Sequence, residues 1–495
     1  MLDQGRIDAL RAEPVAAQGH LIDGAVVAAS DGQVMDTTSP IDGQGLTTLA
    51  RGTTEDMDRA VAAARAAFAD GRWSRQPPAA RKAVLLKWAE LIEAEALALA
   101  VLGVRENGTE IGMAFKAEAG SAAGTIRYYA EAIDKRYGEI APTADNVLGL
   151  VHHEPVGVVG AIVPWNFPLM IGAWKLAPAL AAGNSVVLKP AETASLTLLR
   201  VAGLALEAGL PPGVLNVVTG EGPVVGEAMG LSMGVDVLAF TGSGGTGRRL
   251  LGYAARSNLK RCYLELGGKS PNVVFADAPD LGLAAKVSAA GIFRNSGQVC
   301  VAASRLLVED SIHDAFVEAL CKAADGFTVG DPLSLDTQIG AVHSERQLAQ
   351  NLRFVQQAEE EGAQRLCGGA RILTETGGTY MAPTVIAGVK PEANLAQNEV
   401  FGPVLAVTSF KSEEEAVALA NGTDYGLSSG VWTGDLSRAH RMIRAIRAGV
   451  VHVNTYGGSD LTVPLGGVGQ SGNGSDKSLH AMAKYENLKT AWIQL

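Results

Sequence analysis

Cysteine, aromatic residues and long apolar runs are all scarce in this sequence. Aromatic residues make up 5% of the 495 positions, too few for the stacked side chains on which single-stranded nucleic acid binds. No apolar run approaches the roughly 18 residues of a membrane-spanning helix, and the charged segment 1–14 lacks the apolar stretch of a signal peptide. The cysteines have no CxxC spacing, which argues against a disulfide framework and a zinc site and predicts a reducing, cytoplasmic location. They are Cys262, Cys300, Cys321 and Cys367.

The charge balance is acidic and narrows the range of partners. A formal net charge of −11 argues against nucleic acid, whose phosphates need a basic face, and against an anionic membrane surface. Hydrophobic residues make up 47% and charged residues 19% of the chain, the balance of a well-buried globular protein. The length predicts two or three domains. Histidine, cysteine and aspartate do not cluster at metal-ligand spacing, so we predict no metal site and a small-molecule partner.

Strand-like and helical segments alternate along most of the chain. Thr53 and Asp56 have the spacing of a capping box at the start of an alanine-rich helix, and a longer helix is expected over 79–102. Beyond residue 156, short β-branched runs separate helical stretches, as in parallel βαβ units of a doubly wound sheet. The expected strands are Val156–Val163, Ser185–Leu188, Val214–Val218, Val235–Phe240, Cys262–Leu266 and Asn272–Phe275, and the expected helices are Leu169–Ala181, Ser195–Ala208, Pro223–Gly230 and Gly245–Ser257.

A second α/β series follows in the C-terminal half. Ser304–Glu309 and Val404–Phe410 are expected to be strands, and the helices Ile312–Ala324 and Ser412–Ala420 are expected to follow them. Two α/β domains packed against each other place a ligand cleft between them. The sequence therefore predicts an α/β fold with two doubly wound domains and a site at their junction.

A glycine-rich loop follows the expected strand Val235–Phe240. Gly242, Gly244 and Gly247 satisfy GxGxxG between a strand and a helix, a setting in which backbone N–H groups bind the pyrophosphate of a dinucleotide. The same rule places a ribose-binding acid about 20 residues later, which favours Glu265. The chain has 59 glycines, so a glycine-rich turn without special function is the alternative.

Five short motifs occur in a fixed order along the chain. Cys300 ends one of them, FxNxGQxC, at the boundary of a helix-like run and beside Gly297. Such a setting can expose a thiol, although an isolated cysteine is more often a small buried hydrophobe. Taken together, the motifs resemble the aldehyde dehydrogenase superfamily from about residue 20 to the C-terminus. They are Pro164–Pro168, Lys189–Glu192, Leu264–Lys269, Phe293–Cys300 and Glu399–Pro403.

The resemblance implies a domain plan. Residues 1–136 and 155–267 would form a Rossmann-like NAD-binding domain, and residues 268–477 a catalytic domain that carries the nucleophile. Residues 137–154 and 478–495 would form a bridging element, in which a β-hairpin pairs with the C-terminal strand. A neighbouring subunit would cover the exposed strand edge, so the resemblance implies a homodimer or a homotetramer.

The resemblance also implies catalytic roles for the matching residues. Cys300 would be the nucleophile that forms a thioester from an aldehyde, and Asn166 would hold the oxyanion together with the Cys300 backbone N–H. Glu265 would draw a proton from the water that hydrolyses the thioester, a role that replaces the ribose contact expected from spacing. Lys175 and Asp476 match positions of a proton-exit path, and the alternative for each is a solvated charge.

The implied cofactor is NAD. Lys189 and Glu192 match the positions that hold the adenosine ribose, and Glu192 would repel the 2′-phosphate of NADP. Glu399, with Phe401 beside it, matches the position that binds the nicotinamide ribose. The remaining matched positions are the pyrophosphate turn at Gly242, Ser243 and Gly247, and the residues Pro164, Trp165, Gly222, Phe240 and Leu266.

The motifs define the substrate less closely. The segment 470–481, QSGNGSDKSLHA, is similar to the branch that contains γ-glutamyl-γ-aminobutyraldehyde dehydrogenase and related ω-amino-aldehyde enzymes. Arg294 stands where this family often has an aromatic residue, which favours a bulky aldehyde or one with an anionic or oxygenated tail. Alternatively, Arg294 points into solvent or pairs with a local acid. The expected substrate-lining residues are Phe167, Trp174, Arg294, Val299 and Leu465.

Two other functions are compatible with the resemblance. In a CoA-acylating semialdehyde dehydrogenase, CoA replaces water, but that branch usually lacks the base that matches Glu265. A catalytically silent binding protein of the same fold is the second alternative. The presence of Asn166, Glu265 and Cys300 together argues against it.

Overall fold

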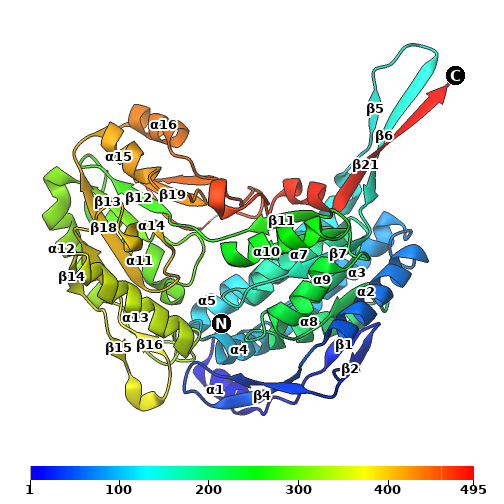
Figure 1. Ribbon diagram of the computed structural model, residues 1–495, viewed down its shortest axis with the longest axis horizontal. Coiled ribbons are helices and arrows are strands. Elements are labelled where there is room, and N and C mark those ends of the chain that lie inside the picture. The colour runs from blue at the N-terminus through cyan, green and yellow to red at the C-terminus, as the bar shows by residue number, and fades with distance from the viewer. Residues whose placement is uncertain (1, 459) are drawn as a thin grey trace.

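Two seven-stranded sheets form the two halves of the molecule (Figure 1). The computed structural model describes residues 2–458 and 460–495. Most neighbouring strands within each sheet are parallel, and helices cover both faces of each sheet. The expected α/β fold with two doubly wound units is confirmed.

The first sheet has the strand order β11-β10-β7-β8-β9-β1-β2. Its central strands are buried at every position because helices cover both faces. The strands are β1 (His20–Ile22), β2 (Ala25–Val27), β7 (Val158–Ile162), β8 (Ser185–Lys189), β9 (Leu215–Val217), β10 (Val237–Thr241) and β11 (Arg261–Glu265). The helices of this half are α2 (Thr54–Ala69), α3 (Pro78–Ala94), α4 (Ala96–Asn107), α6 (Ser121–Ala132), α7 (Pro168–Ala181), α8 (Leu196–Glu207), α9 (Glu227–Leu231) and α10 (Gly244–Ala255).

The capping box predicted at the start of α2 is present. The hydroxyl of Thr53 accepts from the backbone N–H of Asp56 at 3.3 Å, and the Asp56 carboxylate accepts from the backbone N–H of Thr53 at 3.0 Å. A helix cap of this kind contributes about 1 kcal/mol to stability. The local sequence therefore fixes where this helix begins.

The single helix predicted over 79–102 is wrong, because a bend at Glu95 divides this segment into α3 and α4. Glu95 has φ −99° and ψ 11°, outside the helical range. Its carboxylate accepts from Arg200 on α8 at 2.8 Å. Alanine and leucine continue on both sides of the bend, so the hydrophobic periodicity alone does not reveal it.

The second sheet has the strand order β14-β17-β18-β13-β12-β19-β20, with only the edge strand β14 antiparallel to its neighbour. Its strands are β12 (Pro271–Val274), β13 (Arg305–Glu309), β14 (Gln364–Cys367), β17 (Thr384–Ala387), β18 (Val404–Phe410), β19 (Ser428–Trp432) and β20 (Val450–Val453). The helices of this half are α11 (Leu281–Phe293), α12 (His313–Asp325), α13 (Glu345–Glu360), α14 (Asn394–Gln397), α15 (Glu413–Ala420) and α16 (Leu436–Ala445).

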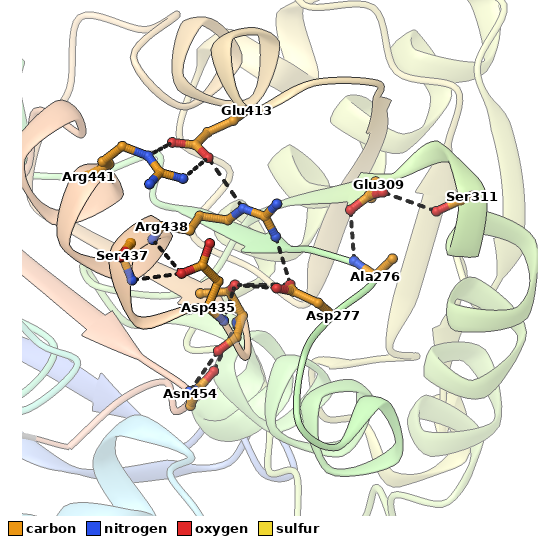
Figure 2. Close-up of polar contacts among 11 residues, drawn as sticks. Ala276, Asp277, Glu309, Ser311, Glu413, Asp435, Ser437, Arg438, Arg441 and Asn454 are labelled. Carbon is orange, nitrogen blue, oxygen red and sulfur yellow. Dashed lines mark hydrogen bonds and ion pairs between the residues drawn. The ribbon is translucent and has the colours of Figure 1, made fainter.

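Ion pairs close the carboxyl edge of the second sheet (Figure 2). Asp277, which follows β12, pairs with Arg438 at 2.9 Å and accepts from the hydroxyl of Thr433, which follows β19, at 2.9 Å. Glu413 at the start of α15 accepts from Arg441 at 2.6 and 2.7 Å and from Arg438 at 3.3 Å. The polar side chains at this edge are therefore bound to one another.

A β-arm projects from the body of the molecule (Figure 1). β5 (Glu139–Ala141) and β6 (Val147–Pro155) form a hairpin, and β21 (Glu486–Gln494) pairs with β6 along its whole length. The predicted pairing of a hairpin with the C-terminal strand is therefore present. Residues 478–485, predicted as part of this element, are different: Leu479–Tyr485 forms a 3-10 helix whose apolar side chains lie in the core of the first half.

The N-terminal segment crosses from the first half to the second. Gln4 on α1 donates to the carbonyl oxygen of Leu333 at 3.1 Å, and the backbone N–H of Thr379 donates to the carbonyl oxygen of Pro40 at 3.0 Å. No helix among the described residues is long and apolar enough to cross a membrane. The remaining elements are α1 (Gln4–Ala12), β3 (Val34–Thr38), β4 (Gly45–Ala50), α5 (Ile111–Met113), a π-helical turn (Ala114–Gly120), β15 (Arg371–Ile372) and β16 (Tyr380–Met381).

Candidate active site

The candidate site residues gather where the two sheets face each other. The first sheet contributes the carboxyl ends of its strands: Asn166 follows β7, Lys189 ends β8 and Glu265 ends β11. The second sheet contributes the amino ends of its strands, because Cys300 precedes β13 and Glu399 precedes β18. Loops from one edge of each sheet thus converge on one junction, although their residues are far apart in the sequence.

Cys300 is half-buried and follows a loop with an unusual backbone. Asn295 and Ser296 both adopt the left-handed conformation, with φ 51° and 52°, which is unfavourable for residues with a side chain. The hydroxyl of Thr109 donates to Asn295 Oδ1 at 2.8 Å, and the hydroxyl of Ser296 donates to the carbonyl oxygen of Gly340 at 2.8 Å. Contacts from both halves of the molecule thus fix the loop that leads to the thiol.

The surroundings of Cys300 favour the protonated thiol. Burial raises the pKa of Cys300 to about 12, and the carboxylates of Glu399 and Glu265 act in the same direction. The reactive form of a cysteine is the thiolate. Activation therefore requires a base that accepts the thiol proton or a positive charge placed beside the sulfur.

Asn166 is buried beside the Cys300 loop. Its Nδ2 donates to the carbonyl oxygen of Gln298 at 2.9 Å, which leaves the second N–H of the amide for another acceptor. Helix α7 begins at Pro168, two residues after Asn166, and Glu118 fixes its first turn by accepting from the backbone N–H of Leu169 at 2.6 Å. Contacts with the Cys300 loop and at the start of α7 thus fix the position of the Asn166 amide.

Glu265 is buried and borders a group of buried charges. Its Oε1 has no hydrogen-bond partner among the described residues. Asp476 lies in the same group and accepts from Lys175 Nζ at 3.1 Å and from Lys484. Burial raises the pKa of Glu265 well above its usual value and Asp476 raises it further, while Lys484 and Lys175 lower it. A carboxylate with a raised pKa is suited to general-base chemistry.

The carboxyl ends of β8 and β10 form an edge suited to a dinucleotide. Lys189 Nζ pairs with Glu192 Oε2 at 2.8 Å. Burial opposes ionisation of Glu192, but the charge and hydrogen bond of Lys189, together with a backbone hydrogen bond and His343, lower the pKa of Glu192. Ser243 caps α10 by accepting a backbone N–H of its first turn, whose other N–H groups are open to an anion. A Cβ at Gly247 would lie 3.0 Å from Leu266, so glycine allows α10 to pack closely on β11.

Other predicted cofactor positions lie along the same edge. Pro164 follows β7, and Phe240 lies in β10. A Cβ at Gly242 would lie 2.5 Å from the Phe240 ring, which explains the small residue at the end of this strand. Gly222 begins a π-helical turn and has open space around it.

Aromatic rings from both halves and a buried acid of the second half lie at the junction of the two sheets. The ring of Trp165 stacks on His343, with centroids 4.0 Å apart and an interplanar angle of 7°, and meets Phe401 edge-on at 5.3 Å. Glu399 Oε1 accepts from the backbone N–H of Gly268 at 3.0 Å. Burial raises the pKa of Glu399 to about 7. These residues bring the two sheet edges into direct contact.

A cavity of about 920 Å³ opens beside the Cys300 loop. Arg294 is exposed on its wall and makes no hydrogen bond or ion pair with the residues that the structure describes. The neighbouring Lys477 Nζ lies 5.9 Å from the centroid of the Trp174 ring. The cavity therefore combines apolar walls with positive charge. All five predicted substrate-lining residues border it, namely Phe167, Trp174, Arg294, Val299 and Leu465.

Comparison with known proteins identifies the family. The model of the Aldehyde dehydrogenase family matches residues 26–491. The chain belongs to this family. Among its relatives, the NADP/NAD-dependent aldehyde dehydrogenase PuuC of Escherichia coli K12 is 50% identical over 474 residues, which cover 96% of this chain and 95% of PuuC. The aminoacetaldehyde dehydrogenase of Pseudomonas aeruginosa is 46% identical over 477 residues, with 96% and 95% of the two chains covered.

Solved structures of other aldehyde dehydrogenases have the same fold over the whole chain. A mutant of the P. syringae indole-3-acetaldehyde dehydrogenase AldA, in complex with NAD+ and IAA, is 48% identical and superposes with a TM-score of 0.99 over 100% of both chains. The γ-glutamyl-γ-aminobutyraldehyde dehydrogenase of Burkholderia cenocepacia is also 48% identical, with a TM-score of 0.98 over 100% of both chains. The predicted resemblance to this branch is thereby confirmed.

Sequence patterns did not indicate several residues around the site of this aldehyde dehydrogenase. Glu118 lies in the π-helical turn that precedes α6, and His343 precedes α13. Lys484 lies in the 3-10 helix before the β-arm. Each belongs to a segment without catalytic motif, and only the fold brings it to the junction. A buried charge in an otherwise apolar segment, such as the lysine in LHAMAKY, is the one signal that the sequence offers.

Proposed function

We propose that this chain oxidises an aldehyde to a carboxylic acid, with Cys300 as the nucleophile and NAD as the cofactor. The observation that carries the proposal is the arrangement of Cys300, Asn166 and Glu265 at the junction of the two sheets. These side chains supply the three groups that the reaction needs: a nucleophile, an oxyanion donor and a base.

The first chemical step takes place at Cys300. A base first accepts the thiol proton. The thiolate sulfur then adds to the aldehyde carbon, a C–S bond forms, and the carbonyl oxygen becomes negatively charged. The free N–H of Asn166 and the backbone N–H of Cys300 donate to this oxygen, and one such donor contributes about 2.7–4 kcal/mol. Loss of hydride from the carbon restores the C=O bond and leaves a thioester. NAD supplies the hydride acceptor when it is bound.

The second step is hydrolysis of the thioester. Water adds to the thioester carbon while Glu265 accepts one of the water protons. The C–S bond then breaks, which releases the carboxylic acid and restores the sulfur of Cys300. Asp476 and Lys175, which lie in the same buried charge group as Glu265, would carry the proton away from the site.

The cofactor positions divide between the two halves of the molecule. In the first half, Lys189 and Glu192 would hold the adenosine ribose, and the capped start of α10 the pyrophosphate. In the second half, Glu399 and Phe401 would hold the nicotinamide ribose. We expect NADP to be used less well than NAD, because the Glu192 carboxylate would repel a 2′-phosphate.

The substrate we propose is a bulky aldehyde or one with a polar or anionic tail. The 920 Å³ cavity offers the space, and Arg294, unpaired among the described residues, offers a partner for a carboxylate. The relatives are named for chemically different aldehydes, among them aminoacetaldehyde and indole-3-acetaldehyde, so their names alone do not select one.

The β-arm supports assembly into a homodimer or homotetramer. Ile140, Leu488 and Trp492 are 76%, 68% and 66% exposed on it, and the outer edges of β5 and β21 have no neighbouring strand in the three-stranded sheet. Exposed apolar side chains on an open strand edge favour pairing with another copy of the chain.

NADH formation with a panel of aliphatic, aromatic, amino- and carboxy-aldehydes tests the proposal. We expect activity that requires NAD, is unaffected by CoA and is absent from Cys300→Ala. A gain of activity on addition of CoA would indicate acyl transfer to CoA instead of water. Activity that survives in Cys300→Ala, or no activity with any aldehyde, would contradict the proposal.

A further inference from the structure

Four buried charged side chains gather around the segment that ends at Asp476. Asp476, 1% exposed, accepts from Lys175 Nζ at its Oδ2, at 3.1 Å, and from Lys484 Nζ at its Oδ1. Lys175 and Lys484 are 1% and 6% exposed. Glu265, 7% exposed, lies beside the segment that leads to Asp476: it forms a β-bridge with Gly472, and its Oε1 would lie 3.0 Å from a Cβ at Gly474. This Oε1 has no hydrogen-bond partner among the described residues. Burial of one carboxylate with two lysines costs desolvation free energy and leaves a surplus positive charge. We therefore expect this charge to have a function.

The charge of this group balances only in one state of Glu265. Lys175 and Lys484 carry two positive charges, and Asp476 carries one negative charge. The group is neutral when Glu265 is ionised and has a surplus positive charge when Glu265 is protonated. Neutrality in a buried, low-dielectric site therefore favours the ionised form of Glu265.

We propose that Lys484 is a positioning residue for thioester hydrolysis: by cancelling the charge of Asp476, it allows Glu265 to be ionised and to accept the proton of the attacking water. This inference rests on the proposed function of Glu265 as the base. Lys484 reaches the site from the 3-10 helix Leu479–Tyr485, which is anchored in the core of the first half. It is not among the residues that line the substrate cavity, and its side chain donates to Asp476.

The other groups that face Glu265 do not provide the same balance. Burial and Asp476 both disfavour its ionised form, and among the charged groups around it only Lys484 and Lys175 favour it. Cys300 and Tyr485 also face Glu265, and burial raises the pKa of both, so they add no positive charge. Removal of Lys484 would leave two carboxylates with one lysine. The pKa of Glu265 would then rise further, so a larger fraction of the base would be protonated at any given pH.

A charge role and a purely structural role predict different results. If Lys484 only holds the 3-10 helix in place, loss of either partner of the Lys484–Asp476 pair should impair the enzyme in the same direction. If the charge matters, Lys484→Met and Asp476→Asn should move the pH dependence in opposite directions. The former removes a positive charge near Glu265, and the latter removes a negative one.

The experiment measures kcat against pH with saturating NAD and an aldehyde that the wild type oxidises. In Lys484→Met we expect the midpoint of the acidic limb to rise by about one pH unit or more, while the first-turnover burst of NADH keeps its amplitude. In Asp476→Asn the midpoint should fall, and in the double variant it should return toward that of the wild type. Lys484→Arg, which keeps the charge, should retain the wild-type midpoint. Lys87→Met, which removes an exposed lysine on α3, serves as the matched control.

Each outcome decides between the alternatives. Midpoints that move in opposite directions in the two single variants support the inference. Unchanged midpoints, or shifts in the same direction, would overturn it. If Lys484→Met does not fold, the downward shift in Asp476→Asn and the return in the double variant still test the charge balance. Glu265→Gln separates the proposed function from this inference. Normal turnover of Glu265→Gln would contradict the role of Glu265 as the base. Impaired turnover of Glu265→Gln together with a wild-type pH profile of Lys484→Met would contradict only the role of Lys484.

Discussion

The two sheets meet at the candidate active site, and each presents a different end of its strands there. The first sheet presents the carboxyl ends of its strands, where Asn166, Lys189 and Glu265 lie. The second presents the amino ends, where Cys300 and Glu399 precede their strands. Ligands of open α/β sheets usually bind at the carboxyl ends. The first sheet follows this rule and the second departs from it.

The structure gives a physical reason for the departure. The carboxyl edge of the second sheet, where a ligand would be expected, is closed by the ion pairs of Asp277 and Glu413 with Arg438 and Arg441 (Figure 2). Its amino edge is free to carry long loops, such as the one that holds Cys300. The comparison teaches that the half proposed to bind the adenosine end of the cofactor follows general rules of the fold, whereas the half proposed to carry the nucleophile depends on specific loops.

The largest effect is expected when Glu265, the proposed base at the edge of the first sheet, is replaced and Cys300 is kept. Glu265→Gln should lower steady-state turnover by about 10²–10⁴-fold, because thioester hydrolysis loses its proton acceptor. Stopped-flow absorbance should still record a first burst of NADH. Loss of the burst in Glu265→Gln, or normal turnover, would contradict the assignment of thioester formation to Cys300 and of hydrolysis to Glu265.

The next largest effect is expected at Asn166, which links the two edges through Gln298. Asn166→Ala should lower kcat/KM for the aldehyde by about 10²–10³-fold, because the oxyanion loses a side-chain donor. Asn166→Asp keeps the size but removes the N–H donor and should be equally impaired. Steady-state kinetics measure both, and a loss of less than about threefold in either variant would contradict the oxyanion role.

A smaller effect is expected on the cofactor side of the first sheet. Lys189→Ala should raise the KM for NAD by about tenfold, equivalent to ~1.4 kcal/mol of binding, with kcat nearly unchanged. The lysine contacts only the adenosine half of the cofactor in this account. A fall in kcat at saturating NAD would mean that Lys189 also affects the chemical steps.

The smallest effect is expected at the closed edge of the second sheet. Arg438→Ala removes two ion pairs that are partly exposed and should lower stability by no more than about 1 kcal/mol. Thermal unfolding should therefore shift by only a few degrees, with kcat/KM unchanged. Arg444→Ala on the same helix is the control, because Arg444 forms no ion pair among the described residues. Loss of activity in Arg438→Ala would point to a function at this edge.

Most of the fold could be predicted from the sequence, because buried parallel strands have a continuous apolar pattern. Val404–Phe410 has the predicted ends, and β8 extends the predicted strand by Lys189 alone. The bend at Glu95 could not be predicted, since apolar periodicity continues across it. Nor could the position of residues 478–485, because their burial depends on a core built by segments hundreds of residues earlier.

The site was predictable to the extent that its residues lie in motifs. Cys300, Glu265 and Asn166 each belong to one, and the structure places all three at the junction. Spacing alone predicts that Glu265 contacts a ribose. The GxGxxG rule describes a single dinucleotide-binding sheet and takes no account of a second sheet opposite it. Lys484 and His343 lie outside any motif and reach the site only through tertiary packing.

The most direct test of the account is the mass of Glu265→Gln after incubation with NAD and a good aldehyde substrate. We predict a covalent adduct with the mass of the acyl group on the peptide that contains Cys300, because the nucleophile still forms the thioester and hydrolysis is blocked. Glu265→Gln combined with Cys300→Ala should carry no adduct. An unmodified Cys300 peptide, or an adduct on another residue, would contradict the division of nucleophile and base between the two sheets.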